Sequence, residues 1–184
     1  DDMPAADDWS HAGIDYCVLF GLMSGIGNDL FDPAGETTRA MLVSMLYRMA
    51  GEPDVSGLPE LPFADVAPDA WYADAVRWAY ANKVVLGTDD THFAPDARLT
   101  RAQLVTMLYR AYGPEKDVRP RPIGGYTDWN TVPDWAYPAT TWAVSMGILY
   151  GTTRTELSPN TGANRAQLAL FMMRTCRLQG ELDS

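Results

Sequence analysis

The chain contains one sequence unit three times, and this repetition limits its fold more than any other feature. Tryptophans, arginines, glycines, apolar residues and prolines recur with separations of 62 and 64 residues. They are Trp9, Trp71 and Trp135; Arg39, Arg101 and Arg165; Gly25, Gly87 and Gly151; Phe31, Phe93 and Leu157; and Pro33, Pro95 and Pro159. Self-similarity at a fixed period is typical of repeat architectures. We therefore expect three copies of one structural unit.

Each unit has the pattern of a helix, an irregular loop and a second helix, most clearly in the middle copy. A first helix is expected after Pro68, with Asp69 as its N-cap. The apolar stretch that follows this helix ends at Gly87, which is expected to supply a positive φ. The second helix is expected to begin at Thr100.

The start of the second helix carries a capping signal in two of the three units. Thr100 and Gln103 form a T-x-x-Q capping box, and Asn164 and Gln167 keep this pattern in the third unit. Met41 replaces the glutamine in the first unit, so its cap should be weaker. An arginine follows each cap, although a cation opposes the helix dipole there by about a few tenths of a kcal/mol. Capping and packing leave these arginines unexplained.

The repeat predicts a closed, mainly α fold. A single helix pair cannot bury its own apolar face, whereas three pairs around a common centre can. Hydrophobic residues make up 47% of the chain, which suffices for such a core. We expect a pseudo-threefold bundle of three helix–loop–helix units in one domain; the alternative is a short open solenoid. The expected units are 1–51, 52–113 and 114–184, with Pro- and Gly-rich linkers at 51–62 and 113–125.

Composition and motifs exclude several classes of function. Fourteen basic and 24 acidic residues give a net charge of −10, which argues against nonspecific nucleic-acid binding. The longest apolar run, 16–23, is too short to span a bilayer, and residues 1–8 have no signal-peptide pattern. His11 and His92 are isolated, so we expect no metal site. No motif points to a catalytic residue or a cofactor, and we expect no enzyme activity.

Two cysteines leave two interpretations open. Cys17 and Cys176 are far apart in the sequence and have no C-x-x-C spacing. A disulfide is possible if the ends of the chain meet. Two small buried thiols are the favoured alternative, because free cysteine usually packs as a small hydrophobic residue.

With these motifs assembled, the chain resembles the S-layer homology family in its form of three tandem modules. FADVAPDAWYADAVRWAYANKVVLGT and LTRAQLVTMLYR in the middle unit carry the resemblance, with YTDWNTVPDWAYPATTWAVSMGILYGT and NRAQLALFMMR in the third. The first unit contributes DWSHAGIDYCVLFGLMSG and TTRAMLVSMLYR. The resemblance covers about residues 8–178. The first unit is expected to lack the lead-in aspartate present at Asp65 and Asp128, so its lead-in is incomplete.

The resemblance implies an extracellular anchoring module of a bacterial surface or S-layer protein. The implied partner is a secondary cell-wall polysaccharide with pyruvylated sugar, bound in grooves between neighbouring modules of a pseudo-threefold spindle. The implied ligand-binding residues are the helix-start arginines, their glutamines, the lead-in aspartates, two tryptophans and the loop glycines. They are Arg39, Arg101, Arg165, Gln103, Gln167, Asp65, Asp128, Trp71, Trp135, Gly87 and Gly151.

The side-chain chemistry supports an anion site and leaves alternatives open. A guanidinium can hold a carboxylate through two parallel hydrogen bonds, beside helix N-terminal amides that also favour an anion. The alternative is that the arginines pair with the lead-in aspartates and lock adjacent modules. Trp9, Trp71 and Trp135 can stack on sugar, but helical spacing favours core positions for them. Competing functions are a protein–protein or self-assembly module and, least favoured, a hydrolase.

Overall fold

The computed structural model describes residues 2–113 and 122–182, and these contain six α-helices and two short 3-10 helices. Most of the predicted linker 113–125 and the expected boundary at 113/114 lie outside the described residues. The helices are α1 (His11–Leu19), α2 (Arg39–Met49), α3 (Ala73–Ala81), α4 (Arg101–Tyr112), η1 (Trp129–Thr131), η2 (Asp134–Ala136), α5 (Tyr137–Ser145) and α6 (Arg165–Leu182). None of the described helices has the length and apolar character needed to cross a membrane.

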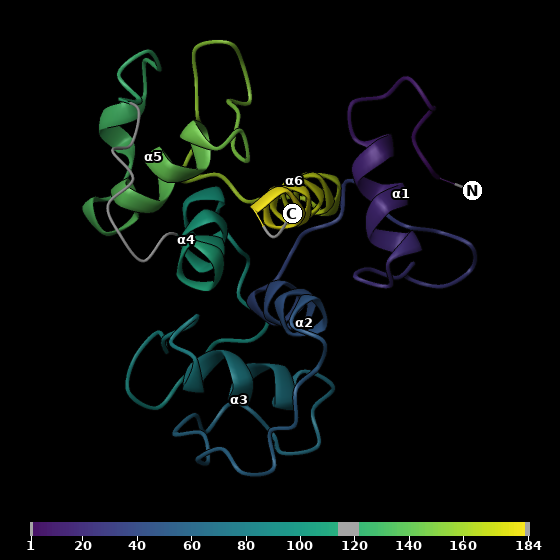
Figure 1. Ribbon diagram of the computed structural model, residues 1–184, viewed down its shortest axis with the longest axis vertical. Coiled ribbons are helices and arrows are strands. Elements are labelled where there is room, and N and C mark those ends of the chain that lie inside the picture. Colours follow the sequence, from purple (N-terminus) through teal and green to yellow (C-terminus); the bar gives the residue numbers. More distant parts are fainter. Residues whose placement is uncertain (1, 114–121, 183–184) are drawn as a thin grey trace.

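The second helix of every unit lies at the centre of the molecule, and the first helices lie outside it. Figure 1 shows α2, α4 and α6 together, with α1, α3 and α5 around them. α2 packs on α3, α4 packs on α5, and α6 packs on α1. Each second helix therefore packs against the first helix of the next unit, and the third unit returns to the first. The predicted mainly helical domain of three units is confirmed, and its cyclic packing is compatible with pseudo-threefold symmetry.

The inner helices supply matching residues to one core. Two positions of the apolar stripe are fully buried in all three units. They are Leu42, Leu104 and Leu168, followed one turn later by Leu46, Leu108 and Met172. Trp142 is also buried, and Trp78 at the corresponding position of the middle unit is half-buried and packs against the same core. The repeat thus places equivalent side chains around a common centre.

The start of each inner helix is bonded to the loop of the next unit. The amides of Arg39 and Ala40 donate to the carbonyl oxygens of Ala97 and Pro95, at 3.1 and 3.0 Å. The corresponding amides of α4 donate to the third unit, and those of α6 donate to the first. The following amide is held by the cap side chain, as between Met41 and Thr38. The expectation that these helix N-terminal amides are open to an anion was therefore wrong.

The capping predictions were right for the second helices and wrong for the first helix of the middle unit. Thr100 and Gln103 form both bonds of the capping box, and Asn164 and Gln167 do the same. α3, in contrast, begins at Ala73 and has no side-chain cap. The amides of Ala70 and Ala73 bond to carbonyl oxygens three residues earlier, so consecutive turns occupy the segment after Asp69.

The packing of α6 on α1 brings the two cysteines into the same region. Both are free thiols, with Cys17 buried and Cys176 half-buried. The Cys17 Sγ–H donates to the carbonyl oxygen of Ala169 in α6 at 3.4 Å. Burial, together with the nearby Cys176, raises the pKa of Cys17 to about 12.

Candidate functional site

Three grooves lie between the units, and each is lined by two arginines, a glycine and a tryptophan from equivalent positions of the repeat. The first groove, of about 500 Å³, is lined by Arg39, Gly87, Gln103, Arg110 and Trp135 among others. The second groove, of about 310 Å³, is lined by Arg101, Gly151, Gln167, Arg174 and Trp9 among others. The third groove, of about 250 Å³, is lined by Arg165, Gly25, Met41, Arg48 and Trp71 among others. Every groove takes its helix-start arginine from one unit, its glycine from the next and its tryptophan from the remaining one.

The helix-start arginines are buried and bridge adjacent units through backbone carbonyls. Arg39, Arg101 and Arg165 are 9%, 3% and 7% exposed. Arg39 donates through Nε to the carbonyl oxygen of Phe93 (2.8 Å) and through Nη2 to that of Leu86 (2.9 Å). Matching bonds run from Arg101 to Leu157 and Tyr150, and from Arg165 to Phe31 and Ser24. The arginines therefore lock the units together, but through carbonyl groups rather than aspartates.

Aromatic rings cover one side of each guanidinium. The Cζ atoms of Arg39 and Arg165 lie 4.6 Å from the ring centres of Phe93 and Phe31. Leu157 replaces the phenylalanine at the second groove, and Arg101 instead lies 5.4 Å from the ring centre of Phe171. Such contacts favour the cation and fix the plane of its hydrogen-bond donors.

The buried guanidinium charges have no ion-pair partner among the described residues. Burial lowers the pKa of Arg101 to about 10, and it lowers the pKa of Arg39 and Arg165 as well. All three arginines stay charged at neutral pH. Since a guanidinium has five N–H donors and two are bonded to carbonyls, each arginine retains donors toward its groove. A buried, unpaired cation of this kind favours an anionic ligand.

The lead-in aspartates hold the loop to which the arginines are bonded. Asp65 accepts from the amides of Phe93 (2.8 Å) and Ala94 (2.7 Å), and Asp128 accepts likewise from Leu157 and Ser158. Burial raises the pKa of Asp65, but these backbone hydrogen bonds outweigh it and leave the pKa below its ordinary value. The aspartates thus position the arginines through the loop and do not line the three grooves.

The first unit does have an aspartate in this role, contrary to the sequence-based expectation. Asp2 accepts from the amides of Phe31 (2.7 Å) and Asp32 (2.6 Å). Asp2 therefore holds the loop of the first unit in the same way as Asp65 and Asp128 hold the other two. Asp2 stands 63 residues before Asp65, whereas the tryptophans that follow them are 62 apart, and this one-residue offset concealed it.

The loop glycines are required by space rather than by backbone conformation. None of Gly25, Gly87 and Gly151 has a positive φ, so that expectation was wrong. A Cβ at Gly87 would meet the carbonyl oxygen of Asp89, and one at Gly151 would meet those of Thr153 and Glu156. A side chain at these positions would displace the loop that forms one wall of the groove.

Each capping glutamine serves both the helix and its groove. Gln103 Oε1 accepts from the amide of Thr100 at 3.0 Å, and Gln167 Oε1 accepts from that of Asn164 at 3.4 Å. Their NH₂ groups keep donors for the groove. Met41 provides no such donor in the third groove. The three grooves therefore differ in polarity.

The tryptophans at the groove edges are exposed, so the preference for core positions was wrong. Trp9, Trp71 and Trp135 are 57%, 66% and 56% exposed. All three precede the first helix of their unit and lie outside its buried stripe. Each lines a groove whose arginine comes from a different unit. An exposed indole beside donor groups offers a flat surface for a sugar ring.

A second arginine in each groove was missed by the sequence analysis. Arg48 and Arg110 lie in the last turns of α2 and α4, Arg174 lies in the middle of α6, and they line the third, first and second grooves in that order. Their separations are again 62 and 64 residues, which was the available signal. Basic residues in a last helical turn are ordinarily explained by the helix dipole, and this explanation hides a role at the groove.

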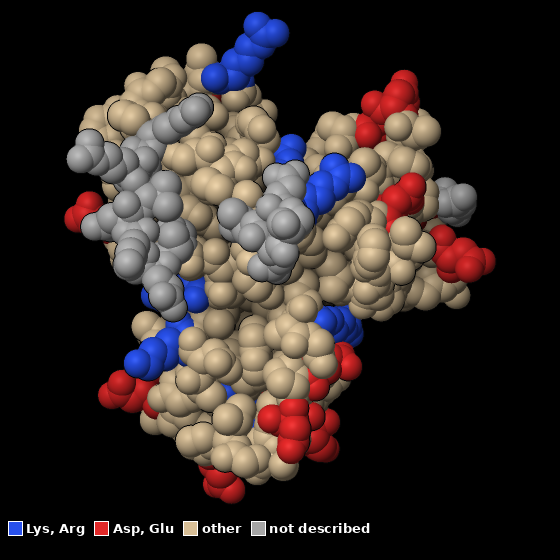
Figure 2. Space-filling view, in the orientation of Figure 1, with Lys and Arg blue, Asp and Glu red and all other residues tan. Residues whose placement is uncertain are grey.

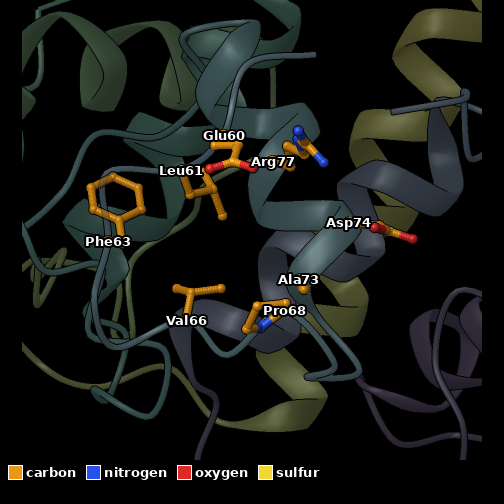
Figure 3. A pocket seen from close by; sticks show the side chains of 8 residues that line it. All are labelled: Glu60, Leu61, Phe63, Val66, Pro68, Ala73, Asp74 and Arg77. Atoms are coloured by element: carbon orange, nitrogen blue, oxygen red, sulfur yellow. The ribbon is translucent and has the colours of Figure 1, made fainter. Parts of the chain in front are cut away.

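Acidic and basic side chains are distributed differently over the surface. In Figure 2, acidic side chains lie mostly at the outer ends of the lobes, and several basic ones lie beside the clefts between lobes. Figure 3 shows a separate cavity of about 220 Å³ within the second unit, bordered by Leu61, Phe63 and Val66. Arg77 at its edge is bonded to the carbonyl oxygens of Leu58 and Pro59. This cavity lies within one unit, and Glu60 and Asp74 also line it beside Arg77, so the grooves remain the candidate site for an anion.

The described residues contain no group of three or more His, Cys, Asp or Glu side chains arranged to hold a metal ion. His92 bonds to Asp89 through Nδ1 at 3.0 Å in the exposed segment 88–92. The arginines and tryptophans that line the grooves offer a ligand hydrogen-bond donors, positive charge and aromatic surface.

Comparison with known proteins is consistent with this arrangement. The family model described as S-layer homology domain matches residues 1–40, 62–105 and 125–169. The chain is 30% identical over 158 residues to the surface-layer 125 kDa protein of Lysinibacillus sphaericus, covering 84% of this chain and 13% of that protein. It is 29% identical to an S-layer protein of Bacillus thuringiensis subsp. finitimus, covering 95% and 21%. An amylopullulanase of Thermoanaerobacterium thermosulfurigenes is 26% identical, covering 90% and 9%.

Proposed function

Because this chain belongs to the S-layer homology domain family, we propose that it is the noncatalytic anchoring part of a bacterial surface protein. Surface-layer proteins among its relatives support an extracellular location at the cell surface. The chain spans only 13%, 21% and 9% of the three relatives described above, so most of each relative lies outside this similarity. The enzyme name of one relative therefore supports no catalytic role for this chain.

The proposed ligand is an anionic cell-wall polysaccharide whose acidic group is a pyruvylated sugar. One observation carries this proposal: every groove contains a buried guanidinium that is bonded only to neutral carbonyl groups. A sugar carboxylate would supply the missing negative charge through charge-assisted hydrogen bonds. The exposed tryptophan at the edge of each groove would pack on the sugar ring.

A test of this function uses the exposed tryptophans, because their replacement should leave the fold intact. We would titrate the 184-residue chain with a glycoside of pyruvylated N-acetylmannosamine in a calorimeter. Trp135→Ala should abolish or weaken binding of the glycoside in the first groove, which Trp135 lines. Trp129→Ala is the matched control, since Trp129 is 45% exposed but lines none of the three grooves.

The result that would overturn the proposal is an absence of binding heat with the folded wild-type chain. An equal loss in the Trp129→Ala control would also contradict a groove site. Sedimentation of the same variants with purified cell-wall material extends the test to the polymer. Binding should weaken as salt concentration rises, because the contact depends on charge.

Self-association is the second candidate, and one surface feature favours it. Leu19 and Phe20, at the end of α1, are 80% and 62% exposed, with Val18 and Ile26 also exposed nearby in sequence. Adjacent exposed apolar side chains are typical of interaction surfaces. Light scattering of the wild type and of Phe20→Ser tests this candidate: oligomers lost in the variant would support it, and a monomeric wild type would refute it.

A further inference from the structure

The first groove differs from the other two in how its second arginine is held. In the second groove, Arg174 Nη1 donates to the carbonyl oxygen of Ile148 at 3.0 Å, and its Cζ lies 4.5 Å from the ring centre of Tyr150. In the third groove, Arg48 Nη1 donates to the carbonyl oxygen of Leu22 at 2.9 Å. Arg110 in the first groove is exposed and has no hydrogen-bond partner within the described part of the chain.

Nearby charged groups act on the pKa of the helix-start arginine in every groove. Burial lowers the pKa of Arg39, the positive charge of Arg110 lowers it further, and Asp65 acts to raise it. In the third groove, Asp32 and Asp2 act to raise the pKa of Arg165. In the second groove, the charge of Arg174 likewise acts to lower the pKa of Arg101. The first and second grooves therefore both contain two guanidinium groups that repel each other, and the first differs in that its second arginine is not bonded to a carbonyl group of the described residues.

We propose that Arg110 contacts the acidic group of the ligand in the first groove and makes this groove selective for acidic over neutral sugar. This inference rests on the proposed function. Arg39 has two donors fixed by carbonyl groups, whereas the exposed head of Arg110 can turn a full edge of its guanidinium toward a carboxylate. A carboxylate between the two arginines also removes their mutual repulsion.

The test observes each groove separately through its own tryptophan. The indole N–H groups of Trp135, Trp9 and Trp71 report the first, second and third grooves in NMR spectra of ¹⁵N-labelled protein. The probes are the glycosides of pyruvylated N-acetylmannosamine and of N-acetylmannosamine itself. Arg110→Gln should weaken binding of the pyruvylated probe at Trp135 by about tenfold or more, because a charge-assisted hydrogen bond is lost. Binding at Trp9 should stay within about twofold.

Two further variants make the result specific. Arg110→Lys keeps the charge without the planar fork and should bind with intermediate strength. Arg174→Gln is the equivalent substitution in the second groove, and it should weaken binding at Trp9 less than Arg110→Gln weakens it at Trp135. Urea unfolding should show that Arg110→Gln is as stable as the wild type, while Arg174→Gln loses the bond to Ile148 and unfolds earlier.

Unchanged affinity at Trp135 in Arg110→Gln would overturn this inference while leaving the proposed function in place. An equal loss of affinity for the acidic and neutral probes would overturn it as well, because Arg110 would then contribute no selectivity. If the pyruvylated probe moves none of the three indole signals in the wild type, the proposed function itself fails.

Discussion

Arg165 of the third unit donates from Nε to the carbonyl oxygen of Phe31, 134 residues earlier in the chain, at 2.8 Å. A second bond, from Nη2 to Ser24, strengthens the same junction. Equivalent bonds join the first unit to the second and the second to the third. The guanidinium groups therefore close the bundle and line its grooves at the same time.

Replacing Arg101 should destabilise the fold as well as any ligand contact. Arg101→Ala leaves the carbonyl oxygens of Leu157 and Tyr150 without their donor, and we expect a loss of about 2–4 kcal/mol in the free energy of unfolding. Arg110→Ala, at an exposed position, should change it by about 0.5 kcal/mol or less. Urea unfolding measures both values, and equal stability of the two variants would contradict the bridging role.

Acid should weaken the bundle through the lead-in aspartates. In Asp65 and Asp128 burial acts to raise the pKa, but the backbone hydrogen bonds prevail, so the folded-state pKa lies below the ordinary value of 3.8. A depressed pKa contributes stability that is fully present above pH 3.8 and is lost as the pH falls through the folded-state value. The free energy of unfolding should therefore decline below about pH 4.

Asp65→Asn is the matched variant for this pH dependence. It should be less stable than the wild type at pH 7, and its stability should vary less between pH 5 and pH 2, because one of the titrating groups is gone. Thermal unfolding followed by circular dichroism across this range measures both effects. Parallel curves for the two proteins would exclude a contribution from Asp65.

A buried hydroxyl in α5 offers a stabilising substitution. The Thr140 Oγ1 atom is buried without a hydrogen-bond partner, at the position occupied by Ile14 and Val76 in the other units. Thr140→Val should raise the free energy of unfolding by about 1 kcal/mol, because an unpaired polar group becomes apolar at nearly constant volume.

Thr106→Val is the control for this substitution, because the Thr106 hydroxyl already donates to the carbonyl oxygen of Ala102 at 2.8 Å. We expect no increase in the free energy of unfolding from Thr106→Val. A Thr140→Val protein that melts at or below the wild-type temperature would show that the hydroxyl does not cost stability.

The two thiols should differ in reactivity. Burial first, and then the nearby Cys176, raise the pKa of Cys17 to about 12, so little reactive thiolate forms at Cys17 near pH 8. Iodoacetamide should modify Cys176 faster than Cys17 in the folded protein, and both at similar rates in urea. Peptide mass spectrometry at successive times measures the rates, and equal modification in the folded state would contradict the buried position of Cys17.

The sequence predicted the repeat, the helix pairs and the caps of the second helices because these depend on residue type and spacing. It could not predict the bonds of Arg39, since the partners are backbone carbonyl groups, which every residue has. The exposure of Trp71 was missed because Pro68 and Asp69 resemble a helix start, whereas turns fill the segment before Ala73. The glycines in the loops indicated that a side chain was not tolerated there. Only the structure shows that the reason is contact of a Cβ atom with neighbouring carbonyl oxygens and not a positive φ.

The sharing of every groove among three units has a consequence for avidity. Two units alone would contain no complete groove, and the closed ring has no end at which a fourth could be added. Solenoid proteins can extend a binding surface one repeat at a time. A protein with more than three grooves must therefore contain further complete sets of three units, either joined in one chain or assembled side by side. The linkers or the neighbouring molecules then set the effective concentration of the grooves.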